Sequence, residues 1–131
     1  MKKVRTKTTK KDFKKFIEYC EYWKEELDIS DVHLLYEHNI DQEYRNKLAT
    51  SLYSYGGSDA ILCLNPRWDE EVNDDKLFDA AYEEMGHILT GPVAALMQAR
   101  TYNKDTTASE LHKLIHKIRT IIDKHRLNAA R

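Results

Sequence analysis

The sequence has no long apolar run and very little cysteine. No stretch of its 131 residues approaches the roughly 20 apolar residues that a membrane-spanning helix requires. The basic opening segment lacks the apolar core that follows in a signal peptide. Cys20 and Cys63 are too far apart for a CxxC motif, and a chain of this size can bury a core without a disulfide. We therefore expect a cytoplasmic protein in which both thiols are reduced.

The charge of the chain gives no general argument for nucleic-acid binding. The formal net charge is -1, with 41 % hydrophobic and 33 % charged residues, which is typical of one well-solvated globular domain. Basic residues concentrate in residues 1–11 and acidic residues in 69–84. We expect residues 1–10 to form a flexible basic arm and residues 11–131 to form a single domain. Nucleic-acid contact through the arm is the less favoured alternative.

The first half of the chain changes from helical to strand periodicity. Apolar positions between Lys11 and Leu27 follow helical spacing, and Asp12 is a candidate cap for this helix. The period then becomes two, and a Gly56-Gly57-Ser58-Asp59 turn predicts a hairpin between the last two strands. The strands are expected over 32–36, 47–55 and 60–65.

The second half is predicted to be helical, so the expected fold class is α+β. An apolar stripe predicts a helix over 74–89, which the Thr90-Gly91-Pro92 segment is expected to end. A short helix is expected over 93–99, and Thr106 or Thr107 is expected to cap a last helix that packs on the domain. The apolar stripe of this last helix comprises Leu111, Leu114, Ile115, Ile118 and Ile122.

The segment from Glu83 to His87 matches the zinc-peptidase pattern HExxH except at its first position. In HExxH the two histidines lie one helical turn apart and bind the same ion, and the glutamate takes a proton from the metal-bound water. Here Glu83 replaces the first histidine, and a carboxylate is also a legitimate zinc ligand. The candidates are Glu83 and His87 as metal ligands and Glu84 as catalytic base. A solvated acidic turn with one exposed histidine is the alternative.

A zinc site needs a third ligand, and the last helix offers His112. Glu110 competes with it, whereas His116 is expected to point away from the apolar stripe. Candidate donors to a reaction oxyanion are Tyr53, Tyr55 and Tyr102, for which ordinary packing is the favoured interpretation.

The chain resembles a group of small phage and prophage proteins that have a gluzincin-like HExxH helix and are classed as metallopeptidase-like. The resemblance lies in residues 60–68, which look like the edge strand of that group, in 83–89 and in 110–118. It implies a three-stranded sheet packed on the metal-bearing helix, with zinc as cofactor. By this resemblance His87 matches the second ligand, Glu84 matches the base, and Glu83 departs from the first ligand.

Two functions follow with nearly equal weight. The first is a zinc-dependent peptidase that acts on a peptide or protein substrate. The second is a non-catalytic binding protein on a zincin-like scaffold that modulates a host protein. The missing first histidine slightly favours the second, since it puts both zinc binding and catalysis in doubt.

Overall fold

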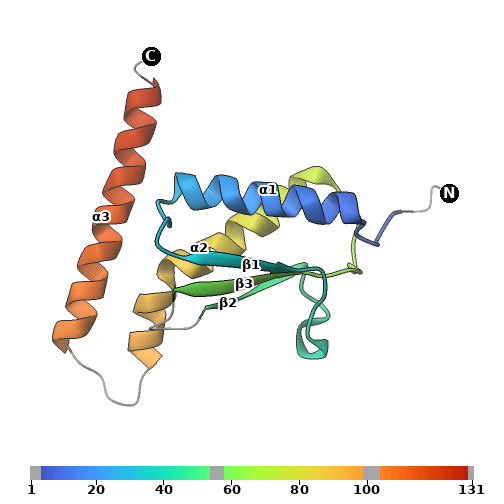
Figure 1. Ribbon diagram of the computed structural model, residues 1–131, viewed down its shortest axis with the longest axis horizontal. Coiled ribbons are helices and arrows are strands. Elements are labelled where there is room, and N and C mark those ends of the chain that lie inside the picture. The colour runs from blue at the N-terminus through green and yellow to red at the C-terminus, as the bar shows by residue number, and fades with distance from the viewer. Residues whose placement is uncertain (1–3, 54–57, 99–103, 130–131) are drawn as a thin grey trace.

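The computed structural model describes residues 4–53, 58–98 and 104–129. Over these residues the chain has an α+β fold in which helices pack on one face of a three-stranded sheet (Figure 1). This confirms the predicted fold class and the order of its elements. The elements are α1 (Lys10–Glu26), β1 (His33–Glu37), the short 3-10 helix η1 (Gln42–Tyr44), β2 (Ala49–Tyr53), β3 (Asp59–Leu64), α2 (Asp74–Gln98) and α3 (Lys104–Ala129).

Helix α1 begins with a capping box. Thr9 is the N-cap, its hydroxyl accepts a hydrogen bond from the backbone N–H of Asp12, and the Asp12 carboxylate accepts one from the backbone N–H of Thr9. The sequence had indicated Asp12 as a candidate cap. In the structure Asp12 is instead the third residue of the helix. A carboxylate in the first turn also interacts favourably with the helix dipole.

The segment before α1, which the sequence predicts to be a flexible arm, makes main-chain hydrogen bonds to the connection between β3 and α2. The main-chain oxygens of Arg5 and Thr6 accept hydrogen bonds from the N–H groups of Val72 and Trp68, both at 2.8 Å. The Thr8 N–H donates to the Pro66 oxygen at 2.9 Å. Arg5–Thr8 thus lie along the connection between β3 and α2, held by main-chain hydrogen bonds. Residues 1–3 lie outside the described residues.

The sheet has the order β1-β3-β2, with β1 parallel and β2 antiparallel to β3. The antiparallel pair confirms the predicted hairpin, although residues 54–57 of its turn lie outside the described part. The resemblance had placed the strand that ends before Asn65 at an edge of the sheet. This was wrong, because β3 pairs on both sides and the edges are formed by β1 and β2.

The core lies between the sheet and two helices. Leu34, Ala60, Leu62 and Leu64 are buried on one sheet face, where Phe16 and Cys20 of α1 and Leu77, Ala81, Met85 and Ile88 of α2 join them. The opposite sheet face is open to solvent, and the Leu52 side chain on it is 70 % exposed. This alternation of buried and exposed positions is that of an antiparallel or mixed sheet covered on one face.

Helix α2 runs through the predicted break at 90–92 and continues to Gln98 without a separate helix over 93–99. Pro92 removes one N–H from the helical ladder, but the remaining turns keep the helix continuous. Gly91 is not a cap. A Cβ atom there would lie 3.1 Å from Cδ1 of Tyr53, so this glycine permits close packing of α2 against β2.

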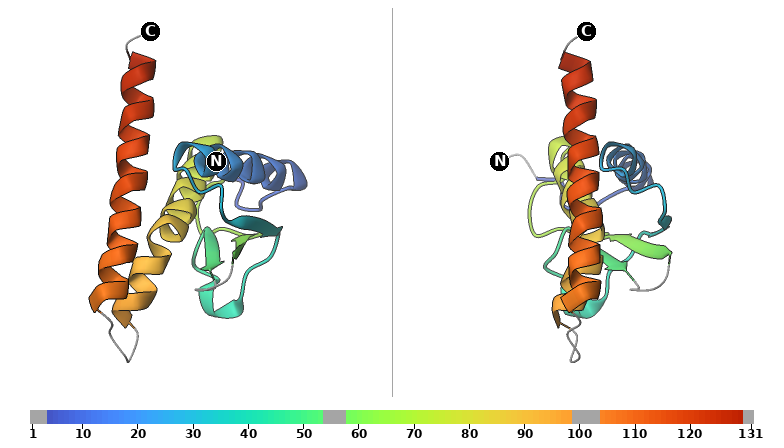
Figure 2. Two further views of the ribbon diagram at one scale, coloured as in Figure 1. Left: turned by 60° about the vertical axis from the view of Figure 1, so that its left-hand side comes forward. Right: turned by 90° about the vertical axis from the view of Figure 1, so that its left-hand side faces the viewer.

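Helix α3 begins at Lys104, before the threonines expected to cap it, and runs antiparallel to the C-terminal half of α2 (Figures 1 and 2). Its position relative to α1 is held by polar contacts. The Lys117 ammonium pairs with Asp31 at 3.4 Å, and Lys124 donates to the Glu25 main-chain oxygen at 2.9 Å. None of the helices in the described part combines the length and apolar character needed to cross a membrane.

Candidate functional site

The start of α2 sets which residues face the core. The Asn73 side chain accepts a hydrogen bond from the Lys76 N–H at 2.9 Å and so caps the helix. From this start, the helical period turns Glu84 toward the buried face with Met85 and Ile88, and leaves Glu83 and His87 exposed one turn apart. The motif residues are thus divided between two faces of one helix.

Glu84 is the unusual residue of this helix. The residue is only 9 % exposed. Its Oε2 atom has no hydrogen-bond partner among the residues that the structure describes. Burial, and to a smaller extent the neighbouring charge of Glu83, raise the pKa of Glu84 to about 7, with Lys47 partly opposing them. Glu84 is therefore present in both protonation states near neutral pH.

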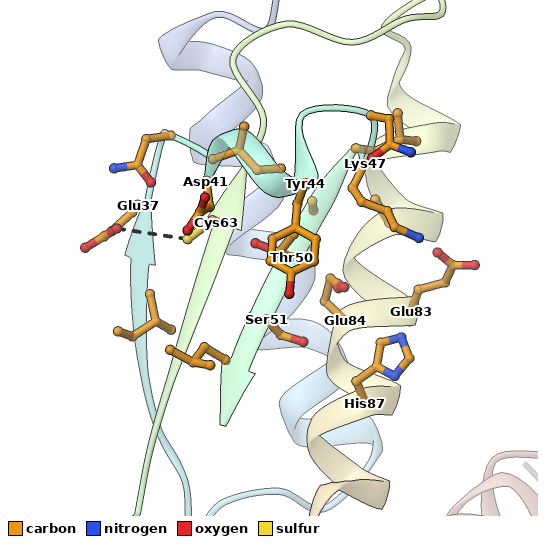
Figure 3. Close-up of a pocket in the computed structure, with 18 of the residues that line it drawn as sticks. Glu37, Asp41, Tyr44, Lys47, Thr50, Ser51, Cys63, Glu83, Glu84 and His87 are labelled. Carbon is orange, nitrogen blue, oxygen red and sulfur yellow. Dashed lines mark hydrogen bonds between the residues drawn. The ribbon is translucent and has the colours of Figure 1, made fainter. Parts of the chain in front are cut away.

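A cavity of about 970 Å³ is lined by α2, β2, the segment that precedes β2, and residues of β1 and β3. Figure 3 shows Glu83, Glu84 and His87 of α2 on one side of this cavity, with Ser51 of β2 next to Glu84 and Lys47 above them. Five carboxyl side chains line the cavity, whereas Lys47 is the single lysine or arginine in its lining. The five are Glu37, Asp41, Glu70, Glu83 and Glu84. The cavity therefore has an acidic wall and favours cationic groups.

Asn65 holds the segment that leads into β2. Its buried side-chain amide donates hydrogen bonds to the main-chain oxygens of Arg45 at 3.0 Å and Lys47 at 2.8 Å, and its Oδ1 accepts one from Arg67. The Leu48 oxygen accepts hydrogen bonds from the Asn65 N–H and the Trp68 indole. These contacts fix both Lys47 and the first residue of β2 at the cavity.

The register of the hairpin shows which main-chain groups of β2 face outward. The hydrogen bond from the Asn65 N–H to the Leu48 oxygen makes these residues a hydrogen-bonded pair of the antiparallel ladder. Such pairs alternate along the strands, so Thr50 and Leu52 bond to β3, while the N–H and C=O groups of Ala49 and Ser51 point away from it. These groups face the cavity side, where all residues from Lys47 to Leu52 contribute to the lining.

The predicted third metal ligand lies elsewhere. His112 is exposed on α3, and its Nε2 atom lies 3.0 Å from Nε2 of His116. The alternative, Glu110, pairs with Lys113 at 3.2 Å. Neither residue lines the cavity, because the contacts of α3 hold it against the end of α1 and the loop before β1.

Within residues 4–53, 58–98 and 104–129, no group of three His, Cys, Asp or Glu side chains is close enough to hold a metal ion. Glu83 and His87 share the cavity wall, but a structural or catalytic zinc site requires at least three protein ligands. The residues present therefore do not fit the zinc centre that the sequence predicts.

Sequence reasoning found the three motif residues of the cavity but missed those from other elements. Lys47, Ser51 and Tyr44 come from a segment that carries no motif, and only the pairing of β2 with β3 brings them to α2. Tyr53 packs against Gly91, as its favoured interpretation suggested. Tyr55 and Tyr102 lie outside the described residues.

Comparison of the chain with protein-family models, with curated proteins and with solved structures gives no match. The resemblance to zincin-like proteins therefore stays a prediction.

Proposed function

We propose that this protein binds an extended, basic segment of a partner polypeptide along β2, without catalysing a reaction on it. The observation that carries the proposal is the edge strand itself. The outward N–H and C=O groups of Ala49 and Ser51 line the same cavity as the carboxyl groups of α2. A bound strand would add to the sheet beside β2, which is a recurrent way for proteins to recognise peptides.

The charge and shape of the cavity support a basic segment. Main-chain hydrogen bonds give a β-strand ligand affinity without sequence preference, and specificity comes from the pockets that take its alternate side chains. Glu83 offers an exposed carboxylate to lysine or arginine side chains of the ligand. Leu52 and Ile61 offer apolar surface on the outer face of the sheet. The favoured ligand therefore alternates basic and apolar residues.

Glu84 has a defined part in this proposal. The Glu84 side chain is next to Ser51, and a carboxyl with a pKa of about 7 can donate a hydrogen bond as the acid or accept one as the carboxylate. A peptide amide or a cationic side chain in the cavity would interact with this carboxyl group. We also propose the cytoplasm as the location, where the free thiols Cys20 and Cys63 stay reduced, and a host protein as the partner implied by the resemblance.

Replacement of Ser51 tests the edge-strand proposal. Ser51→Pro removes an N–H that points away from β3, so the ladder within the sheet is kept while one hydrogen bond to a peptide is lost. Binding of fluorescent basic–apolar decapeptides, followed by anisotropy, should weaken at least tenfold in Ser51→Pro. The matched variant Ser51→Ala keeps the N–H and should bind like wild type.

Three controls accompany this measurement. Circular dichroism and the unfolding midpoint should show that Ser51→Pro is folded. Peptides with glutamate in place of lysine should bind at least tenfold more weakly, and added salt should weaken the binding of the basic peptide. Equal affinity of Ser51→Pro and Ser51→Ala, or of the acidic and basic peptides, would overturn the proposal.

A hydrolase is the second candidate, and the pKa of Glu84 is the observation that favours it. A carboxyl group that titrates near 7 is well matched to accept a proton from an attacking water at neutral pH. In this case the purified wild-type protein should cleave peptides when assayed with and without added zinc. The variant Glu84→Gln should not cleave them. Absence of cleavage by the wild type under both conditions would reject this candidate and leave the binding proposal intact.

A further inference from the structure

Helix α3 turns its most apolar stripe toward solvent. Leu111, Ile115, Ile118 and Ile122 are each between 41 % and 61 % exposed. They recur at intervals of four, three and four residues, which places them on one continuous line along the helix. The sequence had led us to expect this stripe against the domain. The structure corrects that expectation and leaves a large aliphatic surface outside.

The face that α3 presents to its own domain is more polar. Its half-buried positions are Glu110, Leu114, Lys117, Ile121 and Lys124. Ile121 packs against the core, whereas the two lysines contact α1 and the following loop through polar atoms. Figure 1 shows that the C-terminal half of α3 extends beyond α1. The aliphatic stripe is therefore left without a partner among the described residues.

We propose that this stripe is the contact surface for a second copy of the chain, with the two α3 helices antiparallel. The spacing of the stripe reads the same in both directions, so a two-fold axis between residues 116 and 117 maps it onto itself. Leu111 then faces Ile122 of the second copy, and Ile115 faces Ile118. This is the self-complementary arrangement that a symmetric dimer interface requires and the seam spacing of a coiled coil.

The same axis also lies at the middle of the helix. Lys104 and Ala129 are equally distant from it along the chain, so the two helices overlap over their full length. The stripe offers on the order of 400 Å² per copy, about half of what a standard interface buries on each partner. Pairing therefore needs this full overlap, and the dimer is expected to form reversibly as concentration rises.

Charges beside the stripe distinguish a second copy from an acidic partner. His112 and Arg119 each follow a stripe residue directly and border the stripe on one side. In the antiparallel pair His112 of each copy lies beside Arg119 of the other, and these side chains carry like charges, which salt screens, when His112 is protonated. Self-association should therefore strengthen with added salt, whereas binding of an acidic helix would weaken.

Sedimentation velocity over a range of concentrations tests the proposal. Wild type should shift from monomer to dimer, and Ile115→Lys should weaken self-association at least tenfold. Ile115 is exposed in the monomer, so this variant is expected to keep its fold. The matched control Val4→Lys alters an apolar residue of similar exposure, 57 %, in the segment before α1 and should associate like wild type. A monomer at every concentration, or equal association of Ile115→Lys, would overturn the proposal.

Disulfide cross-linking tests the orientation. In a Cys63→Ser background, oxidation of a mixture of Leu111→Cys and Ile122→Cys proteins should give mixed dimers. Two copies of either variant alone should cross-link poorly, because residues eleven positions apart on a helix are separated by about 16 Å. Self-cross-linking of each variant alone would indicate parallel helices and contradict the proposal. Both tests measure contact between α3 helices and not binding of a peptide, so the result does not depend on the proposed peptide binding.

Discussion

The side-chain amide of Asn65, at the end of β3, donates a hydrogen bond to the main-chain oxygen of Lys47, just before β2, at 2.8 Å. A second hydrogen bond reaches the oxygen of Arg45, and the carbonyl oxygen of the same side chain accepts the Arg67 N–H. One buried residue thus fixes the entry to the edge strand and, through it, the cavity.

Asn65→Ala should therefore destabilise the protein and loosen the start of β2. Loss of hydrogen bonds to buried main-chain groups costs about 2–3 kcal/mol. Urea unfolding should show this decrease, and hydrogen exchange should be faster at 47–49. Asn46→Ala, which alters an exposed asparagine in the same segment, should change the free energy of unfolding by less than about 0.5 kcal/mol. Equal stabilities of the two variants would contradict this role of Asn65.

Glu84 makes the stability of the protein depend on pH in a defined direction. Its pKa is raised from 4.5 to about 7 on folding, so the folded state binds this proton more tightly than the unfolded state. The stabilisation that the protonated Glu84 carboxyl contributes is fully present below about pH 4.5, and it is lost as the pH rises to about 7. Relative to Glu84→Gln, wild type should lose roughly 2–3 kcal/mol between pH 5 and 8. Parallel pH profiles of the two proteins in urea unfolding would refute a buried, protonated Glu84.

His38 makes the stability of the protein depend on pH in the opposite direction to Glu84. Its Nε2 lies 2.7 Å from the Thr8 hydroxyl, its ring stacks on Phe13, and burial lowers its pKa from 6.5. Stability from the neutral ring is complete above about pH 6.5 and is lost as the pH falls through the lower pKa of the folded state. We expect an NMR titration to give a midpoint below 6.5. In a Glu84→Gln background, His38→Gln should reduce the loss of stability on acidification; an unchanged loss would argue against this.

Two glycines of α2 form a matched pair. A Cβ at Gly86 would have no atom within 4 Å, whereas one at Gly91 would lie 3.1 Å from the Tyr53 ring. Alanine in a helix interior is favoured over glycine by about 1 kcal/mol. Gly86→Ala should therefore raise the free energy of unfolding by about this amount. Gly91→Ala should gain less or lose stability, since Tyr53 must move. Equal gains in thermal unfolding would show that α2 and β2 are not in close contact at Gly91.

The periodicity of the sequence was sufficient to predict most elements. Local alternation and helical spacing depend on burial of one face, and this preference is visible without knowledge of the partner. The break predicted at Thr90–Pro92 was wrong for a physical reason. Gly91 and Pro92 are typical of helix ends, but here one permits close packing against Tyr53 and the other costs a single hydrogen bond in a long helix.

The candidate site was predictable only as far as one helix extends. Glu83, Glu84 and His87 share the cavity because helical geometry places neighbours in sequence together in space. His112 could not be placed in this way, since its position depends on how α3 packs. Tertiary contacts turned α3 toward Asp31 and Glu25, away from the cavity.

The sequence by itself determined the fold class, the extent of the strands and the presence of a carboxylate-rich turn on α2. These properties follow from interactions between residues close in the chain. Only the tertiary structure decided that β2 is an edge of the sheet, that Oε2 of Glu84 is buried without a hydrogen-bond partner among the described residues, and that the aliphatic stripe of α3 faces solvent. Each of these depends on which distant surfaces pack together, because burial and pairing are properties of the assembled fold and not of any segment alone.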